Sequence, residues 1–316
     1  MKPQLLALAD VAKCEGQHHR GLIIRMDNAG TVTTAVIAAA GSATRMWPAS
    51  KTVPKELFPL GRVPAIIHLV WEFVEVGVSR IVIVVSPQAS SLMREMFDPS
   101  LRPPEKIEND PLVRRFLDTL ATTEFVFIDQ TGSYGNGTPL RLAANQVGNF
   151  PCIYAFGDDI VFGENVSRGL LNTFKLTGCP VLAAQQVEEF RKSQFGIIEC
   201  DEVDGIHYVT RLIEKPLVSE TPSSLAAFGR YLVTPDLLDI LRGTVPGRDG
   251  EVWFVDSVIQ RIQKGGRVCA FPLSAGKWYT VGDPTSYALA VQAAHELSAP
   301  KGTRSLPKGS RRVVGR

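Results

Sequence analysis

The chain has 316 residues, of which 45% are apolar and 21% charged, and its formal net charge is +2. This balance gives no electrostatic footprint for nucleic acid, and no apolar run reaches the roughly 18 residues of a membrane span. Five scattered cysteines without CxxC or metal-ligand spacing are typical of reduced thiols in a cytoplasm. We therefore expect a cytoplasmic protein without a nucleic-acid or membrane partner.

The first expected strand is a short apolar run from Ala35 to Ala40, which is typical of a parallel strand covered on both faces. Its loop should emerge at the carboxyl edge of the sheet, where open α/β folds bind ligands. Gly41 allows close approach of a phosphate, and Arg45 and Lys55 add positive charge. Neither GxxxxGK[ST] nor GxGxxG is present, so these local features also fit an ordinary βα connection with surface cations.

The next elements alternate between helix and strand. The pattern predicts a helix from Pro64 to Gly77, a strand from Ile81 to Val85, a surface loop from Asp98 to Asp110, then a helix and a strand from Glu124 to Ile128. This alternation favours a doubly wound α/β sheet.

Two further loops carry chemically informative residues. After the third strand come Gln130, whose amide can match the imide edge of a pyrimidine, and a glycine-rich turn before a helix that begins near Thr138. Later an apolar strand ends in Asp158 and Asp159. Buried carboxylates are costly without a partner, so this pair favours a Mg²⁺ site, against the alternative of a capping or solvated aspartate.

The last third should contain two strands around a turn at Asp204 and Gly205, an edge strand from Arg267 to Phe271, and a closing helix.

Several of these strings together resemble the sugar nucleotidyltransferases, the sugar-1-phosphate nucleotide pyrophosphorylases. The longest string, AAAGSATRMWPASKTVPKELFPL, resembles their G-x-G-T-R-(7–10 residues)-P-K signature. The others are the Q-x4-G-x-G turn, the G-D-x-I motif, FGII followed by EKP, AFGRYLVTPDLL, and an E-x4-D segment at Glu251 and Asp256. The resemblance covers about residues 33 to 297 and is nearest to the bacterial UTP–glucose-1-phosphate uridylyltransferase branch.

The resemblance implies a Rossmann-like, mixed but mainly parallel sheet with a small additional β region for the sugar. It implies transfer of UMP from UTP to glucose 1-phosphate, assisted by Mg²⁺ and releasing pyrophosphate. The catalytic residues would be Arg45, Lys55, Asp158 and Lys215. The nucleotide would contact Ala40, Gly41, Ser42, Ala43, Thr44, Gln130, Gly135 and Gly137. The sugar phosphate would contact Gly196, Glu214, Lys215 and Gly229.

The resemblance also divides the chain: residues 1–30 would be an N-terminal extension, either disordered or an arm of a homo-oligomer, 31–298 the catalytic domain, and 299–316 a flexible basic tail. Asp158 would hold the metal. Relatives place a second carboxylate where this chain has Thr280, and Asp283 is the residue that could replace it.

Other departures are Ala43, where relatives have a second glycine, and Thr138 with Pro139 after the glycine-rich turn. They leave two alternatives open. One is a pyrophosphorylase for another base or for a specialised sugar or cyclitol phosphate. The other is a catalytically silent nucleotide-sugar-binding protein.

Overall fold

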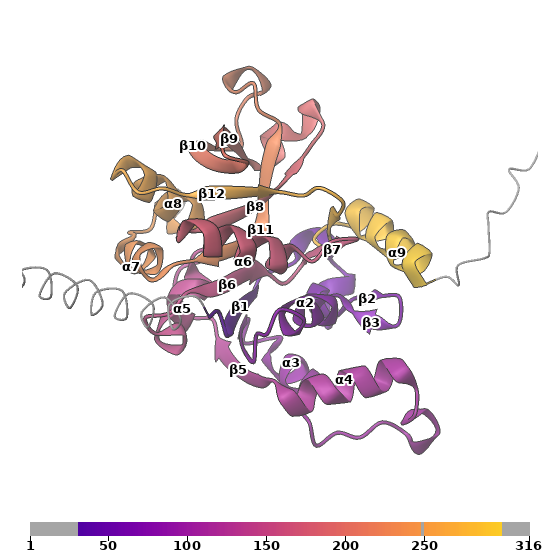
Figure 1. Ribbon diagram of the computed structural model, residues 1–316. Helices are drawn as coiled ribbons and strands as arrows, with labels where there is room; N and C mark the ends of the chain where they lie inside the picture. The colour runs from indigo at the N-terminus through magenta and orange to yellow at the C-terminus, as the bar shows by residue number, and fades with distance from the viewer. Residues whose placement is uncertain (1–30, 248–249, 299–316) are drawn as a thin grey trace, which may run out of the picture.

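The computed structural model describes residues 31–247 and 250–298 (Figure 1). The predicted N-terminal extension and basic tail lie outside these residues. Within the described part, no helix has both the length and the apolar character needed to cross a bilayer.

One nine-stranded sheet forms the centre of the molecule, in the order β5-β4-β1-β6-β11-β8-β12-β10-β9 (Figure 1). Its strands are β1 (Thr34–Ala39), β4 (Arg80–Val85), β5 (Glu124–Asp129), β6 (Cys152–Phe156), β8 (Val181–Gln186), β9 (Gly196–Val203), β10 (Ile206–Glu214), β11 (Leu225–Val233) and β12 (Cys269–Pro272). Two short ribbons pair β2 (Pro59–Leu60) with β3 (Val63–Pro64), and β7 (Asp159–Phe162) with β13 (Lys277–Thr280).

The first half of the sheet is parallel, as the alternation predicted. In it β5, β4, β1 and β6 lie side by side, and Ile37 of β1 stands opposite both Ile83 and Ala155. The second half is mixed, because β11 runs antiparallel to both β6 and β8, and β10 runs antiparallel to β12 and β9. One pair of this half, β8 and β12, is parallel. The sheet is therefore mixed, and the run of parallel neighbours is confined to the first four strands.

Local turn geometry explains part of this mixture. Asp204 and Gly205 both have positive φ, at 52° and 75°, as the tight turns of twisted hairpins require. This turn reverses the chain between β9 and β10, as the sequence predicted. The expected edge strand near residues 267–271 is wrong: β12 lies between β8 and β10, with Cys269 and Ala270 buried.

Helices cover both faces of the sheet (Figure 1). They are α2 (Ala65–Val74), α3 (Ser90–Met96), α4 (Pro111–Thr122), α5 (Thr138–Val147), α6 (Val166–Thr177), α7 (Pro235–Gly243), α8 (Phe254–Gln263) and α9 (Pro284–Ser298). Alternate residues of β1 face opposite layers: Ile37 belongs to the core under α2, α6 and α9, and Val36 to the core under α5, α7 and α8. Because central strands such as β1 and β4 are buried on both sides, their carboxyl ends are the parts free to present a site.

The β7–β13 ribbon brings the end of the chain to this edge. Thr280 stands opposite Asp159, and the backbone N–H of Val281 donates to the carbonyl of Asp158 at 2.8 Å. The preceding loop is held by the Glu164 carboxylate, which accepts the backbone N–H groups of Ala275 (3.1 Å) and Gly276 (2.9 Å). The ribbon is thus fixed next to the acidic pair.

Candidate functional site

An ion pair marks the centre of the site. Lys55 begins the 3-10 helix η3 (Lys55–Leu57), and its Nζ lies 2.5 Å from Oδ2 of Asp158, which follows β6. The two side chains are 12% and 17% exposed, so the pair is shielded but reachable from the cleft. A methyl group on Gly41, just after β1, would stand 3.5 Å from the same Nζ. The structure thus brings together three predicted residues from separate segments.

Arg45 and the β13–α9 turn complete this group. A methyl on Gly282 would lie 2.9 Å from Asp158 Oδ2, 3.1 Å from Thr280 Oγ1 and 3.8 Å from Nη2 of Arg45. Arg45 is exposed, and its guanidinium therefore remains available to an anion. Two cations and one carboxylate from the predicted catalytic set converge here.

Burial and charge shape the ionisation of this group. Burial alone would lower the pKa of Lys55, but the negative charges of Asp158 and Glu56 outweigh it and raise the pKa. Burial raises the pKa of Glu56 to about 8. Burial and the charge of Asp158 raise the pKa of Asp159 to about 7. Lys55 therefore stays charged, whereas its buried carboxyl neighbours resist ionisation.

The phosphate loop contains a strained alanine. Ala43 has φ 49° and ψ 35°, the left-handed region that L-residues occupy at a cost. Two hydrogen bonds hold its carbonyl, from Ser50 Oγ at 2.8 Å and from the Met46 N–H at 3.0 Å. This geometry explains why glycine suits the position in the resembling family.

The second predicted loop is held mainly by packing. Gly135 has φ 113°, and a methyl there would lie 2.3 Å from the carbonyl oxygen of Val252. Gly137 donates its N–H to the same oxygen at 2.8 Å. Both glycines are thus required for contact with the segment before α8. Their contact with a base stays a prediction, as does that of Gln130, which follows β5 and whose amide oxygen is buried with no partner among the described residues.

Predicted sugar residues from three strands surround one cavity of about 160 Å³. Gly196 begins β9, Glu214 ends β10, and Gly229 lies in β11. A methyl on Gly196 would lie 3.1 Å from Oε2 of Glu214. Much of the remaining wall is aromatic and was not predicted: Phe156, Phe195, Phe228, Tyr231, Phe254 and Trp278.

Lys215 does not line this cavity but directly follows Glu214, which does. Its φ is 49°, and its Nζ lies 5.7 Å from the centre of the Trp253 ring. No contact within the described part of the chain joins it to Arg45, Lys55 or Asp158. Of the four predicted catalytic residues, the structure therefore brings three into one group and sets Lys215 at the neighbouring cavity.

Thr280 stands where relatives have a second metal-binding carboxylate, and Asp283 is the residue that could replace it. Both already have local hydrogen-bond partners. Thr280 Oγ1 accepts the Gly282 N–H at 3.1 Å. Asp283 Oδ1 accepts the Ser286 N–H at 2.9 Å, as a helix N-cap does at the start of α9. The role of Asp283 toward a metal stays a prediction.

Sequence reasoning missed two groups near the site, Glu56 and Asn136. Glu56 is 2% exposed beside Lys55, whereas the buried Asp159 was predicted as the second member of the acidic pair. Asn136 lines the cavity and accepts the Phe254 N–H at 2.8 Å. An asparagine between two glycines was a detectable signal for a local backbone hydrogen bond. Nothing in the sequence indicated which distant backbone it would reach.

The comparisons with known proteins agree on one family. The model of the nucleotidyl transferase family matches residues 34–296. A UTP–glucose-1-phosphate uridylyltransferase of Pseudomonas aeruginosa is 31% identical over 268 residues, covering 82% of this chain and 94% of the relative. One of Bacillus subtilis is 32% identical over 261 residues, covering 81% and 88%.

Solved structures give the same likeness. A UDP-glucose pyrophosphorylase complexed with UDP-glucose superimposes with a TM-score of 0.77 at 26% identity, covering 84% of this chain and all of that one. The sequence over most of the chain and the fold thus both match proteins of this kind.

Proposed function

Since the chain belongs to the nucleotidyl transferase family, as its sequence motifs predicted, we propose that it transfers UMP from UTP to glucose 1-phosphate, giving UDP-glucose and pyrophosphate. The observation that carries this proposal is the Lys55–Asp158 pair, with Arg45, beside the cavity lined by Gly196, Glu214 and Gly229. The names of the relatives support the choice of substrates.

The chemistry needs positioning and charge neutralisation more than proton transfer. A sugar 1-phosphate is already anionic, so its oxygen can attack the α-phosphate of the nucleotide in line without a general base. Two anions repel strongly in a shielded cleft. Arg45 would bind the triphosphate and Lys55 the α-phosphate, while Lys215 would bind the sugar phosphate at the cavity border.

Mg²⁺ is the cofactor proposed for this site. Asp158 offers the oxygen ligand that a hard cation prefers, and its 17% exposure leaves it accessible from the cleft. The described residues contain no cluster of three metal-ligating side chains, so Asp158 would hold the ion together with substrate phosphates. When bound, the ion would supply further charge neutralisation on the phosphates.

The base is proposed to be uracil. Gln130 carries a buried amide oxygen without a partner among the described residues, and the imide N–H of uracil is a suitable donor. Cytosine has no N–H at that ring position. A comparison of UTP with CTP and dTTP tests this choice.

The direct test is an assay of pyrophosphate release from UTP, glucose 1-phosphate and Mg²⁺, with UDP-glucose identified as the product. Lys55→Met should remove activity, whereas Lys51→Met, four positions earlier on an exposed 3-10 helix (η2, Ala49–Lys51), is the matched control. If no pair of nucleotide and sugar phosphate releases pyrophosphate, the proposed function fails.

A silent nucleotide-sugar-binding protein is the second candidate. Thr280 has no carboxylate, and the Asp283 carboxylate caps α9. Neither residue is therefore placed to share a metal ion with Asp158, and this favours the second candidate. Calorimetry separates the candidates: the silent protein would bind UDP-glucose equally well without Mg²⁺ and would release no pyrophosphate.

A further inference from the structure

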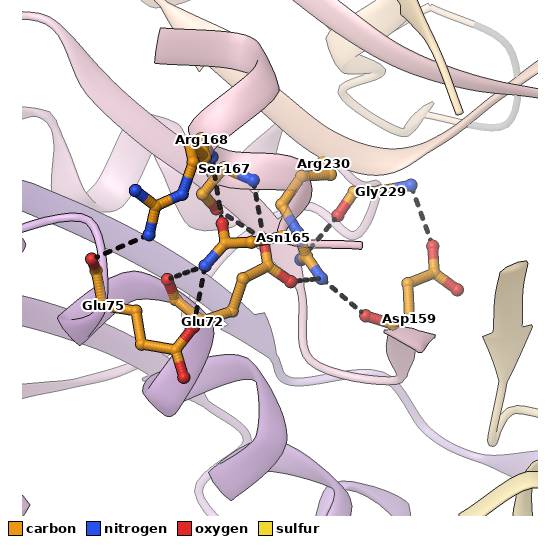
Figure 2. A network of polar contacts seen from close by, with 8 residues as sticks. All are labelled: Glu72, Glu75, Asp159, Asn165, Ser167, Arg168, Gly229 and Arg230. Carbon is orange, nitrogen blue, oxygen red and sulfur yellow. Dashed lines mark hydrogen bonds and ion pairs between the residues drawn. The ribbon is translucent and has the colours of Figure 1, made fainter. Parts of the chain in front are cut away.

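Arg230 of β11 is a completely buried cation outside the group described above. Its side chain has 0% exposure, and it points into the layer between the sheet and helices α2 and α6 (Figure 2). A buried guanidinium is costly unless its N–H groups are paired. Its partners therefore indicate what it does.

Arg230 bridges a helix and the acidic turn (Figure 2). Its Nε lies 3.1 Å from Oε1 of Glu72 in α2, and its Nη2 lies 3.3 Å from the other carboxylate oxygen. The same Nη2 donates to the backbone carbonyl of Asp159 at 3.0 Å. The planar guanidinium makes these bonds from two separate nitrogens in a fixed fork, a geometry that the single nitrogen of an ammonium group lacks.

Glu72 is itself held by the start of α6. Its Oε1 accepts the backbone N–H of Ser167 at 3.0 Å and also the Ser167 hydroxyl. The side-chain amide of Asn165, the N-cap of α6, donates to the Glu72 carbonyl at 3.2 Å. The ion pair is thus anchored on two helices rather than free to shift.

Two consecutive residues of β11 hold the side-chain carboxylate and the backbone carbonyl of Asp159. Gly229 donates its N–H to Oδ2 of Asp159 at 2.8 Å, while Arg230 holds its carbonyl. On the other side, the Val281 N–H holds the carbonyl of Asp158 at 2.8 Å. The backbone is therefore held at the Asp158 carbonyl and again at the next residue, Asp159, directly after the Asp158 side chain.

We propose that Arg230 is a positioning residue that, through the Asp159 carbonyl and anchored by Glu72, fixes the direction of the Asp158 carboxylate toward Lys55 and the cleft. The role of Asp158 as the metal ligand rests on the proposed function. Arg230 does not touch the substrates; it acts by holding the turn on which the carboxylate stands.

The test separates positioning from stability. Removing Arg230 alone leaves the Glu72 charge buried and unpaired, so the double variant Glu72→Gln with Arg230→Met is used, because it removes both charges. We expect its Tm to stay near that of the wild type. We expect kcat to fall at least about tenfold and Mn²⁺ affinity in the presence of UTP, measured by electron paramagnetic resonance, to weaken by a similar factor.

Two further variants make the result specific. Arg230→Lys keeps a charge for Glu72, but its single nitrogen cannot stand at the positions of both Nε and Nη2. It should therefore lose the bond to the Asp159 carbonyl and give the same losses of kcat and Mn²⁺ affinity. Arg80→Met is the matched control: Arg80 bonds a backbone carbonyl (Gln146, 3.0 Å) and a carboxylate (Glu124, 3.3 Å) at the opposite end of the strands. It should lower Tm without changing kcat.

The proposal is overturned if the double variant, or Arg230→Lys should the double variant not fold, keeps kcat and Mn²⁺ affinity within about twofold of the wild type. A crystal structure of the variant gives a readout without turnover, because the Lys55–Asp158 separation should lengthen from 2.5 Å. An unchanged separation also contradicts the proposal. An inactive wild type, in contrast, defeats the proposed function and leaves this structural readout to decide the role of Arg230.

Discussion

The two sides of the cleft are built in different ways. On the phosphate side, Arg45, Lys55 and Asp158 are charged residues at or near the ends of parallel strands, and two of them touch at 2.5 Å. On the sugar side, a cavity of about 160 Å³ is enclosed largely by aromatic rings from separate elements. The first side is defined by charge and the second by shape.

This difference separates the electrostatic binding of phosphates from the recognition of the sugar by shape. Charged groups in a shielded cleft act strongly on phosphates whatever sugar is attached. Shape and hydrogen-bonding groups in an apolar cavity discriminate between sugars. Changes on the two sides should therefore affect different kinetic constants.

The largest effect is expected from Asp158→Asn. The change keeps the size of the side chain but removes the charge that faces Lys55 and would hold the metal, so kcat should fall by about 10³. Pyrophosphate release at saturating substrates measures it. Asp239→Asn, in a surface ion pair with Arg242, is the control and should be silent. Turnover within about tenfold of the wild type would break the phosphate-side assignment.

Lys215→Ala should separate the two sides. Loss of this ammonium removes a phosphate contact at the cavity border, so KM for glucose 1-phosphate should rise about tenfold or more, with KM for UTP little changed. Lys277→Ala is the matched control, since Lys277 also lies over an aromatic ring, 5.4 Å from the centre of Tyr279, and is exposed. Equal changes in both KM values would contradict a distinct sugar side.

Gly135→Ala tests the contact between the glycine-rich loop and the segment before α8. The added methyl would lie 2.3 Å from Val252 O at φ 113°, so we expect a loss of about 2–3 kcal/mol in unfolding free energy. Urea denaturation measures this loss. Gly132→Ala is the control. Gly132 has φ 82°, and a methyl group there would have no atom within 4 Å, so this variant reports the backbone strain alone. Similar losses of unfolding free energy in both variants would mean that the segment around Val252 moves to accommodate the added methyl group.

Glu56→Gln should change the pH dependence of stability. The carboxyl ionises near 4.5 when unfolded, but burial raises its pKa to about 8 in the folded protein. Between these values folding requires a neutral carboxyl, so the wild type should lose stability relative to Glu56→Gln as pH rises from 4.5 to about 8.

Below and above this window the difference in unfolding free energy should be constant. The exposed Glu95→Gln is the control and should show no such trend. A difference between wild type and Glu56→Gln that does not vary with pH would mean that Glu56 is ionised next to Lys55, and the phosphate side would then carry an additional negative charge.

The smallest effect is expected for Ala43→Gly. Glycine removes the left-handed strain of roughly 1–2 kcal/mol but adds unfolded-state entropy of roughly 0.5–1 kcal/mol. We expect a net gain of about 0.5–1 kcal/mol, measured by urea denaturation. Ala49→Gly, in the neighbouring 3-10 helix η2, should instead lose stability. A loss at Ala43 would show that the strain is relieved elsewhere in the loop.

The sequence predicted the phosphate side well because its information is local. A buried strand, a small-residue turn and nearby cations lie within some 20 residues, and Asp158 follows another apolar strand. Parallel strands place such ends together without further information. The capping role of Asp283 was also detectable, since Asp followed by Pro at the start of a helix is an N-cap pattern.

The mixed half of the sheet and the cavity were less predictable. The antiparallel direction of β11 depends on its neighbours β6 and β8, and β12 looks like an edge strand until its partners are known. The pairing of Glu72 with Arg230 spans 158 positions, and no periodicity reports such a contact. Aromatic residues such as Phe195 and Trp278 are equally compatible with an ordinary core.

That span has a consequence for how the protein acquires activity. Contacts between residues so distant in the chain require closure of a very large loop and form late relative to local structure. The acidic turn is completed only when α2, α6 and β11 have met. After dilution from denaturant, recovery of catalytic competence should therefore lag behind recovery of helical circular dichroism.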